Sequence, residues 1–250
     1  MAPRLMAHRG GGLKDEENTL KAIAASLRLS PDLVELDIRR TTDGVLYCHH
    51  GNLLDLLWTA RLQQPAAVLK NRLPSFTTLR DAARLIRDQS TLFLHIRDRT
   101  ITARELIAAL EGIPVRPVWV AASSVGYLAR LTDLPARWLK VLNVGAWCPR
   151  LRVRALRAAG ISIAELYLWD FTRPTVRRLR HVGIDAALSR FLLPRTAYLQ
   201  KARRLSAAWV TDDDLAALNA TLRQEMASSK PDRTRTVTAT TGDNKRTPGP

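Results

Sequence analysis

Glu35 and Asp37 alternate with apolar residues in the stretch VELDIRR at residues 34–40. On a β-strand, side chains two residues apart point to the same side, so the two carboxylates share one face and the apolar side chains share the other. Two carboxylates this close repel each other unless a cation lies between them. Glu35 and Asp37 are therefore candidate ligands for a divalent metal ion.

Three histidines and two arginines lie at the ends of other strand-like stretches. His8 and Arg9 follow RLMA near the N-terminus, His50 ends VLYCHH, and His95 and Arg97 lie at the end of TLFLHIR. Histidine titrates near neutral pH and serves as a general acid or base, whereas the arginine guanidinium binds phosphate oxygens as a fork of donors. A single histidine is more often structural than catalytic, but the recurrence of such residues at successive strand ends favours one shared site.

Eight short apolar stretches are predicted to be strands, and amphipathic stretches between them are predicted to be helices. The predicted strands are residues 4–8, 33–38, 91–96, 116–121, 139–144, 162–169, 184–189 and 206–211. Strict strand–helix alternation implies parallel strands, and eight such units close naturally into a barrel whose active site lies at the C-terminal strand ends. The predicted fold class is therefore α/β, a (β/α)8 TIM barrel. A doubly wound open sheet is the alternative, although no Gly-rich phosphate turn follows the first strand.

The domain organisation follows from the same patterns. Residues 1–226 are predicted to form the barrel, with a last helix at about 213–226, and residues 227–250 to form a disordered basic tail, because the tail has almost no apolar residues to bury. Residues 51–76 form the one long connection that is predicted to be irregular. Such a loop is as often a plain insertion as a functional element.

The formal net charge of +16 is the most unusual feature of the composition. The tail holds five Lys or Arg and two Asp, a net charge of +3, so +13 belongs to the rest of the chain. Much of that charge is arginine scattered over predicted helices. No nucleic-acid recognition motif or aromatic stacking platform accompanies it, so no specific nucleic-acid partner is expected, and attraction of an anionic substrate is the weaker inference that remains.

The compartment is predicted from what the sequence does not contain. It has no apolar run long enough for a transmembrane segment and no apolar signal region at its start, so a cytoplasmic protein is expected. The two cysteines, Cys48 and Cys148, lie in apolar contexts without metal-ligand spacing and are predicted to be reduced, buried thiols.

The motifs AHRGGG, ENT and VELDIRRTTDGVLYCHH, all within the first 50 residues, resemble the signature of the glycerophosphodiester phosphodiesterase family. RLPSFTTLRDA at 72–82 and AAWVTDDD at 207–214 resemble later stretches of that family more loosely. The resemblance implies a TIM barrel of the phospholipase C-like phosphodiesterase type. It also implies metal-dependent hydrolysis of glycerophosphodiesters, or of related lipid-derived diesters, to glycerol phosphate and an alcohol.

The resemblance also implies roles for individual residues. His8 and His50 match the two catalytic histidines, expected to act as general acid and base. Arg9 matches the arginine that contacts the phosphate, and Glu35 and Asp37 match two of the metal ligands. The family's metal ion is Mg or Ca, and its substrate is a small-molecule phosphodiester. The alcohol group of the substrate and the oligomeric state stay open.

Four residues depart from the family's pattern. His95 and Arg97 stand where the family has Glu-x-Lys, so Arg97 keeps a phosphate-binding charge while His95 replaces the third metal carboxylate by a neutral ligand. With fewer carboxylates, Mn or Zn becomes an alternative to Mg or Ca. Gly51 stands where the family has Asp after His, and Glu16 where it has Pro. An alternative function is therefore a catalytically weak relative that binds a phosphorylated ligand or partner.

Overall fold

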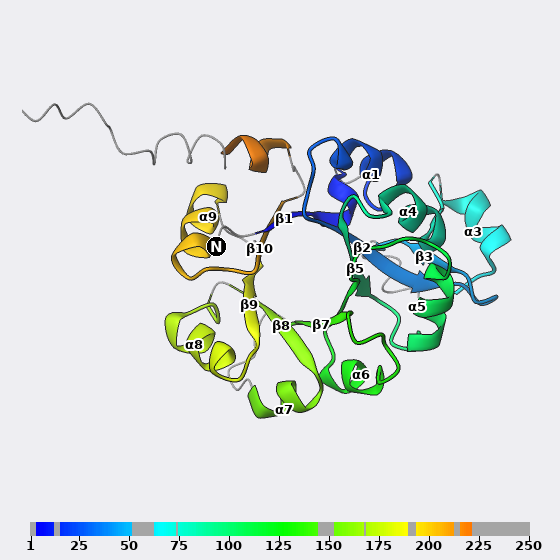
Figure 1. The fold of residues 1–250 in the computed structure, drawn as a ribbon. Coiled ribbons are helices and arrows are strands. Elements are labelled where there is room, and N and C mark those ends of the chain that lie inside the picture. The colour runs from blue at the N-terminus through cyan, green and yellow to red at the C-terminus, as the bar shows by residue number, and fades with distance from the viewer. Residues whose placement is uncertain are drawn as a thin grey trace, which may run out of the picture.

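The structure is a computed structural model in which eight parallel strands form a ring surrounded by helices (Figure 1). It describes residues 4–12, 16–51, 63–73, 75–144, 153–167, 169–189, 194–212 and 216–221. The order of the strands around the ring is β10-β1-β2-β5-β6-β7-β8-β9. The main-chain N–H of Ala208 donates to the Ala186 carbonyl at 2.8 Å, which joins the segment before β10 to β9 and closes the ring. The barrel prediction is confirmed, and the open-sheet alternative is wrong.

All eight predicted strands are present in the barrel, with ends that differ by a few residues. Their bounds are β1 (Arg4–Ala7), β2 (Leu33–Arg40), β5 (Thr91–Ile96), β6 (Trp119–Ala122), β7 (Leu139–Asn143), β8 (Ile161–Leu166), β9 (Asp185–Leu188) and β10 (Trp209–Asp212). Each neighbouring pair in the order from β10 to β9 is parallel. The C-terminal ends of these strands therefore meet at one end of the barrel.

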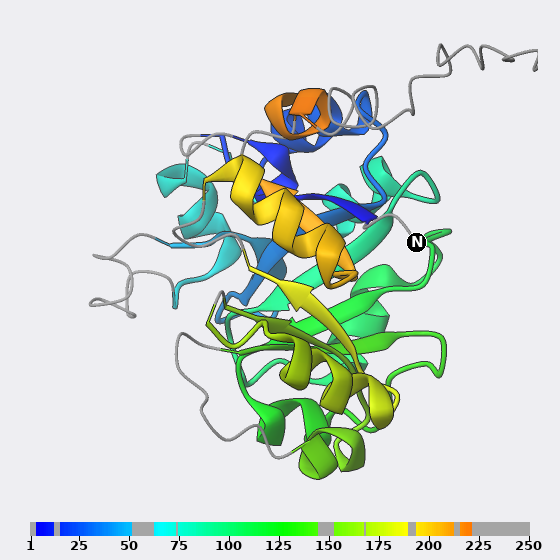
Figure 2. The same cartoon turned by 90° about the vertical axis from the view of Figure 1, so that its left-hand side faces the viewer.

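Helices cover the outside of the ring, and Figure 2 shows α9 in gold lying across β9 and β10. Their bounds are α1 (Leu20–Leu27), α3 (Ala66–Arg72), α4 (Leu79–Ile86), α5 (Ala103–Leu110), α6 (Val125–Arg130), α7 (Val153–Ala158), α8 (Arg173–His181) and α9 (Arg195–Arg204). Residues 216–221 are also helical, within the predicted last helix. The side chains of Thr19, Thr172 and Ser124 cap the N-terminal ends of α1, α8 and α6 by accepting a main-chain N–H three residues on.

Two short antiparallel strands extend the sheet beside β2. β3 (Leu46–Cys48) pairs with β2, and β4 (Thr77–Thr78) pairs with β3. The prediction of an irregular connection over 51–76 is wrong for α3, where Pro65 precedes seven residues that include strong helix formers. Residues 52–62 and 74 lie outside the described part of the chain. The antiparallel β2–β3 hairpin carries the chain back from the end of β2 toward its middle, where the His49 main-chain N–H donates to the Asp37 carbonyl at 2.8 Å, just before His50.

The core has two layers, as expected when strand side chains alternate between the inside of a barrel and the surrounding helices. The inner layer includes Phe93, Trp119 and Trp209, whose ring centroids lie 5.5 to 6.2 Å apart. The outer layer includes the apolar residues of β2 that alternate with Glu35 and Asp37. Apolar packing on both sides of the sheet therefore fixes the direction in which each strand residue points.

Several predictions about the rest of the chain fall partly outside the described residues. Cys48 is buried with a free thiol, as predicted, whereas Cys148 lies outside the described residues. The predicted disordered tail, residues 227–250, lies outside them as well. Among the described helices, none is both long and apolar enough to cross a membrane.

Candidate active site

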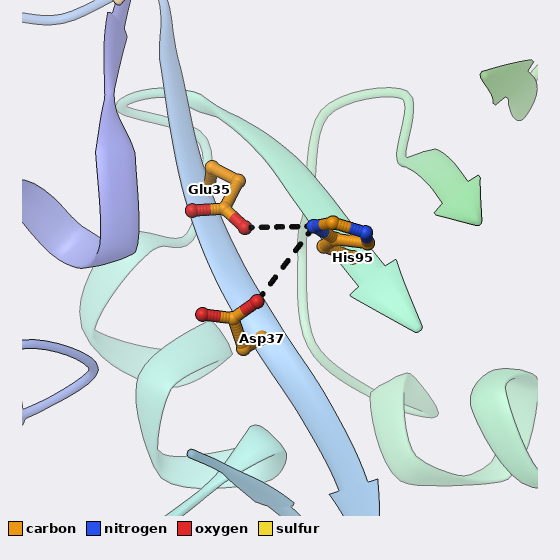
Figure 3. Close-up of side chains that lie close together, drawn as sticks. All are labelled: Glu35, Asp37 and His95. Atoms are coloured by element: carbon orange, nitrogen blue, oxygen red, sulfur yellow. Dashed lines mark ion pairs between the residues drawn. The ribbon is translucent and has the colours of Figure 1, made fainter. Parts of the chain in front are cut away.

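Glu35, Asp37 and His95 form a compact cluster inside the barrel (Figure 3). β2 carries the two acids and pairs with β5, and the register places Asp37 directly beside His95. The Nδ1 atom of His95 lies 3.6 Å from Glu35 Oε1 and 3.7 Å from Asp37 Oδ1. One ligand atom from each residue lies within 4.8 Å of the others, a spacing that suits a single shared cation.

The environment of Glu35 supports a cation at this position. The Oε2 atom of Glu35 accepts a hydrogen bond from the Arg9 main-chain N–H at 2.6 Å, which orients the carboxylate. The Oε1 atom, which faces His95, is buried and accepts no hydrogen bond from any described residue. A buried carboxylate oxygen without a donor is costly unless a ligand supplies the missing interaction. The three side chains therefore fit a metal ion.

Asp37 is fully buried and held by several donors. Its Oδ1 accepts from Arg97 Nε at 2.6 Å and its Oδ2 accepts from Asn18 Nδ2 at 3.2 Å, while Arg9 Nε lies 3.6 Å from Oδ2. Burial alone would raise the pKa of Asp37, but the positive charge of Arg97, followed by His95, outweighs burial and holds the pKa well below its ordinary value. Asp37 is therefore ionised at neutral pH, as a metal ligand must be.

The turn after β1 places His8 and Arg9 against these acids. Arg9 lies in the left-handed region at φ 50°, and Gly10 and Gly11 both have φ 77°. A Cβ on Gly11 would lie 2.8 Å from the Cβ of Ser26 in α1, so only glycine fits this close approach. The tight turn brings His8 Nε2 to 4.0 Å from Glu35 Oε2.

His50 lies just beyond β3 and is oriented by main-chain groups. Its Nδ1 lies 2.8 Å from the Gly51 carbonyl oxygen, which places the proton of the neutral ring on Nδ1 and leaves Nε2 as a proton acceptor. Arg39 donates to the carbonyls of His49 at 3.1 Å and His50 at 2.8 Å, which fixes this segment against β2. The Gly51 carbonyl thus sets the tautomer of His50.

The charges around His50 favour its neutral form. Burial lowers the pKa of His50, the Asp37 carboxylate opposes that effect, and the positive charges of Arg9 and Arg97 lower the pKa further. The net result is a pKa below the ordinary value of 6.5. At neutral pH, the His50 imidazole is therefore available to accept a proton.

The seven residues singled out in the sequence converge at one end of the barrel. Arg97, His95, His50 and His8 all interact electrostatically with Asp37. Arg9 and Glu35 join the same group through the contacts described above. The structure thus brings together every predicted site residue, although it does not by itself assign a role to any of them.

One further acidic residue near the site was missed by sequence reasoning. Glu165 of β8 is buried, and its Oε2 accepts a hydrogen bond from Asn143 Nδ2 of β7 at 3.1 Å. Burial raises the pKa of Glu165, with His95 and His8 acting in the opposite direction. A single acid within the apolar stretch ISIAEL was the available signal, and it went unused because no second acid lies two residues away.

Comparisons with known proteins agree with this fold. Residues 8–106 match the model described as the glycerophosphoryl diester phosphodiesterase family. A probable glycerophosphodiester phosphodiesterase 1 of Mycobacterium tuberculosis is 43% identical over 53 residues, which cover 21% of this chain and 19% of the relative. A mouse lysophospholipase D is 43% identical over 51 residues, covering 20% and 16%. The chain thus matches less than a fifth of the length of these curated relatives.

Solved structures match over most of the chain. A putative glycerophosphodiester phosphodiesterase from Galdieria sulphuraria has a TM-score of 0.77 at 16% identity, covering 89% of this chain and 98% of its own. A phosphodiesterase from Oleispira antarctica, solved with the product sn-glycerol-3-phosphate, has a TM-score of 0.74 at 18% identity, covering 89% and 97%. At these identities the similarity concerns the fold.

The fold and the site together define an α/β barrel with a cluster of acidic, histidine and arginine side chains at the C-terminal ends of its strands. Over residues 8–106 the chain is similar to the glycerophosphoryl diester phosphodiesterase family, and its fold is that of the solved phosphodiesterases.

Proposed function

We propose that this protein is a metal-dependent phosphodiesterase that hydrolyses glycerophosphodiesters, or related lipid-derived diesters, to glycerol phosphate and an alcohol. The observation that carries the proposal is the buried cluster of Glu35, Asp37 and His95, whose ligand atoms lie within 4.8 Å of one another beside two arginines. A cation and guanidinium groups at one place suit a phosphodiester, which is anionic and gains negative charge on its oxygens during attack.

Glu35, Asp37 and His95 would hold the metal ion, and the ion would polarise the phosphoryl group and balance its charge. Mg or Ca is the metal of the family, whereas a nitrogen ligand from His95 makes Mn or Zn an alternative. We therefore propose that these three residues bind the metal ion directly and that the ion is one of these four.

Arg9 and Arg97 would bind the non-bridging phosphate oxygens. Arg97 uses its Nε to contact Asp37 at 2.6 Å, and its terminal nitrogens make no hydrogen bond to any described residue. Arg9 contacts Glu17 through Nη1 at 2.6 Å. Each guanidinium is thus fixed by a carboxylate on one side, which leaves further donors for the phosphate.

His50 and His8 would transfer the protons. His50, neutral and with Nε2 as acceptor, would take a proton from the attacking water or substrate hydroxyl as its oxygen bonds to phosphorus. His8 Nε2 lies 4.0 Å from Glu35 Oε2, an ion pair when the imidazole is protonated. In that form, His8 would give its proton to the alcohol oxygen as the bond from that oxygen to phosphorus breaks.

The test is release of glycerol phosphate from a panel of glycerophosphodiesters, assayed in parallel with Mg, Ca, Mn and Zn. We expect His8→Ala and His50→Ala each to lower kcat by at least about a hundredfold, the usual contribution of a general acid or base. His181→Ala, a change of an exposed histidine at the end of α8, is the matched control and should leave kcat unchanged. The absence of turnover with every diester and every metal would refute the proposal.

A second candidate function is binding of a phosphorylated ligand without turnover. The observation that favours it is the contact between Arg97 and Asp37 Oδ1, the same oxygen that faces His95 in the metal cluster. A guanidinium there competes with a metal for the acid. Phosphate-ligand binding by calorimetry in a protein that hydrolyses no diester would support this function, whereas robust hydrolysis would exclude it.

A further inference from the structure

Glu165 faces the inside of the barrel on the wall opposite the proposed metal cluster. In the ring order, β8 lies four places from β2 in either direction, so the two strands are diametrically opposed. Ile163 of β8 belongs to the inner apolar layer, and Glu165, two residues later, points to the same side. Glu165 therefore lies in the site, on the strand across the barrel from the one that carries Glu35 and Asp37.

The Glu165 carboxyl has little compensation for its burial. Only 7% of the residue is exposed, and Asn143 supplies the one hydrogen bond that its carboxyl accepts from a described residue. No described Lys, Arg or His lies within ion-pair distance of it. A buried carboxyl without a cationic partner is unfavourable, so a ligand that brings positive charge to it would gain more here than at the surface.

Two aromatic residues continue from Glu165 toward the rim of the barrel. Burial, and then the negative charge of Glu165, raise the pKa of the Tyr167 hydroxyl. The Tyr167 ring stacks on the Trp169 ring, with centroids 6.2 Å apart and planes 10° apart. Trp169 is 46% exposed, a large fraction for tryptophan. A carboxyl and an aromatic pair thus follow one another at the end of a single strand.

We propose that Glu165, Tyr167 and Trp169 form a subsite for a cationic alcohol group of the diester, such as a quaternary ammonium or a primary amine. The subsite rests on the proposed function, because Arg9, Arg97 and the metal cluster hold the phosphate on the opposite wall. A phosphate would be repelled by Glu165, so one of the two alcohol groups of the diester reaches this wall, and a carboxylate there favours the alcohol group that carries a positive charge over the neutral glycerol. Carboxylates attract ammonium groups through charge, and the faces of Tyr and Trp attract them through cation–π interaction.

The kinetic test compares diesters that share the glycerol phosphate half and differ in the alcohol. Glycerophosphocholine and glycerophosphoethanolamine carry a cation, whereas glycerophosphoglycerol and glycerophosphoinositol are neutral at that end. We expect Glu165→Gln, which keeps the shape and the Asn143 contact, to lower kcat/KM for the two cationic substrates roughly tenfold, chiefly through KM. For the two neutral substrates, kcat/KM of Glu165→Gln should stay within about twofold of the wild-type value.

Two sets of variants separate a subsite from a structural role. Glu111→Gln removes a charge from an exposed position after α5, at the opposite end of the barrel, and should change nothing. Trp169→Ala should weaken the preference for cationic alcohols, and Trp169→Phe should restore most of it because an aromatic face is kept. An equal loss for cationic and neutral substrates in Glu165→Gln or Trp169→Ala would overturn the proposal.

A binding measurement keeps the subsite testable if the protein hydrolyses none of these diesters. Calorimetry with glycerophosphocholine and glycerophosphoglycerol should give a tighter Kd for the former, and the difference should disappear in Glu165→Gln. Such a result without turnover would refute the proposed hydrolysis and support the subsite. Equal affinities for the two diesters in the wild-type protein would refute the subsite, whether or not hydrolysis occurs.

Discussion

His95 determines how much negative charge the metal cluster can offer. Its Nδ1 faces one oxygen from each of two buried acids, 3.6 and 3.7 Å away. As a neutral ligand, it leaves the cluster with two carboxylates, fewer than hard oxygen-seeking ions such as Mg and Ca usually use in tight sites. A histidine rather than a carboxylate at position 95 should therefore weaken the binding of Mg or Ca and change which metal the cluster prefers.

We expect His95→Glu to tighten Mg or Ca binding roughly tenfold, because a third carboxylate adds charge and an oxygen ligand. Without metal, the same change should lower Tm, since three buried acids repel one another, and added metal should raise Tm more than in the wild type. Calorimetry and thermal melting with each ion measure both effects. His181→Glu is the matched surface control, and an unchanged metal affinity in His95→Glu would place His95 outside the ligand set.

His50 governs the expected pH dependence. Since a general base acts in its neutral form, activity should fall as the pH drops through the pKa of His50, which lies below 6.5. The acidic limb of the kcat/KM profile should therefore lie below pH 6.5, and titration of the His50 ring by NMR should give the same midpoint. An acidic limb above that value, or one that persists in His50→Ala with residual activity, would contradict the assignment.

At the scale of elements, the segment between β1 and α1 and the strand β2 are held together by Asn18. Asn18 is buried with φ 60°, accepts from the Asp37 main-chain N–H at 2.9 Å and donates to Asp37 Oδ2 at 3.2 Å. Both bonds link the tight turn after β1 to the middle of β2. The position of Asp37 in the site thus depends on a residue that contacts no substrate.

We expect Asn18→Gly to destabilise the fold by about 2 kcal/mol, because a buried N–H and a buried carboxylate each lose a partner. Asn18→Ala should cost about 1 kcal/mol more, since alanine pays for the left-handed conformation that glycine adopts freely. Urea denaturation of the two variants measures the difference directly. Equal stabilities would mean that the turn relaxes out of the left-handed region when the side chain is lost.

The elements also show what can be predicted from the sequence. The barrel strands were predictable because each is a short apolar stretch between turn signals, and VELDIRR showed its two faces by alternation alone. The strand β4 was not, because Thr77 and Thr78 form only two residues of a ladder. Glu165 was missed for a related reason: its partner Asn143 lies on another strand, 22 positions away. Pairings of that kind depend on barrel closure and leave no local pattern.

At the scale of the whole molecule, the chain carries a formal net charge of +16, and its site is proposed to bind an anion. Residues 227–250 carry +3 of that charge, and the proposed boundary of the barrel domain is residue 226. The remaining +13 belongs to residues 1–226. Anion attraction should therefore come from the barrel itself.

We expect a chain ending at residue 226 to keep its Tm within about 2 °C and its diesterase activity within about twofold, because a segment with few apolar residues contributes little to the core. The full chain and the truncated chain should show the same decrease of kcat/KM with added salt, since salt screens the charges of the barrel, which both chains contain. A strong loss of stability on truncation would move the domain boundary. If kcat/KM of the truncated chain no longer decreased with added salt, the tail rather than the barrel would be the source of the anion attraction.

The aromatic layer beneath the site affects how a substrate would enter the barrel and how its products would leave. Phe93, Trp119 and Trp209 are each at most 3% exposed, and Arg4 lies over the Trp119 ring at 5.0 Å, so side chains of described residues fill the barrel beneath the site. With the interior filled beneath the site by these described side chains, a diester would enter at the end of the barrel that holds Glu35 and Asp37, and its products would leave by the same end. A retained glycerol phosphate would therefore block the next diester, and we expect product release to be the slowest step of a turnover.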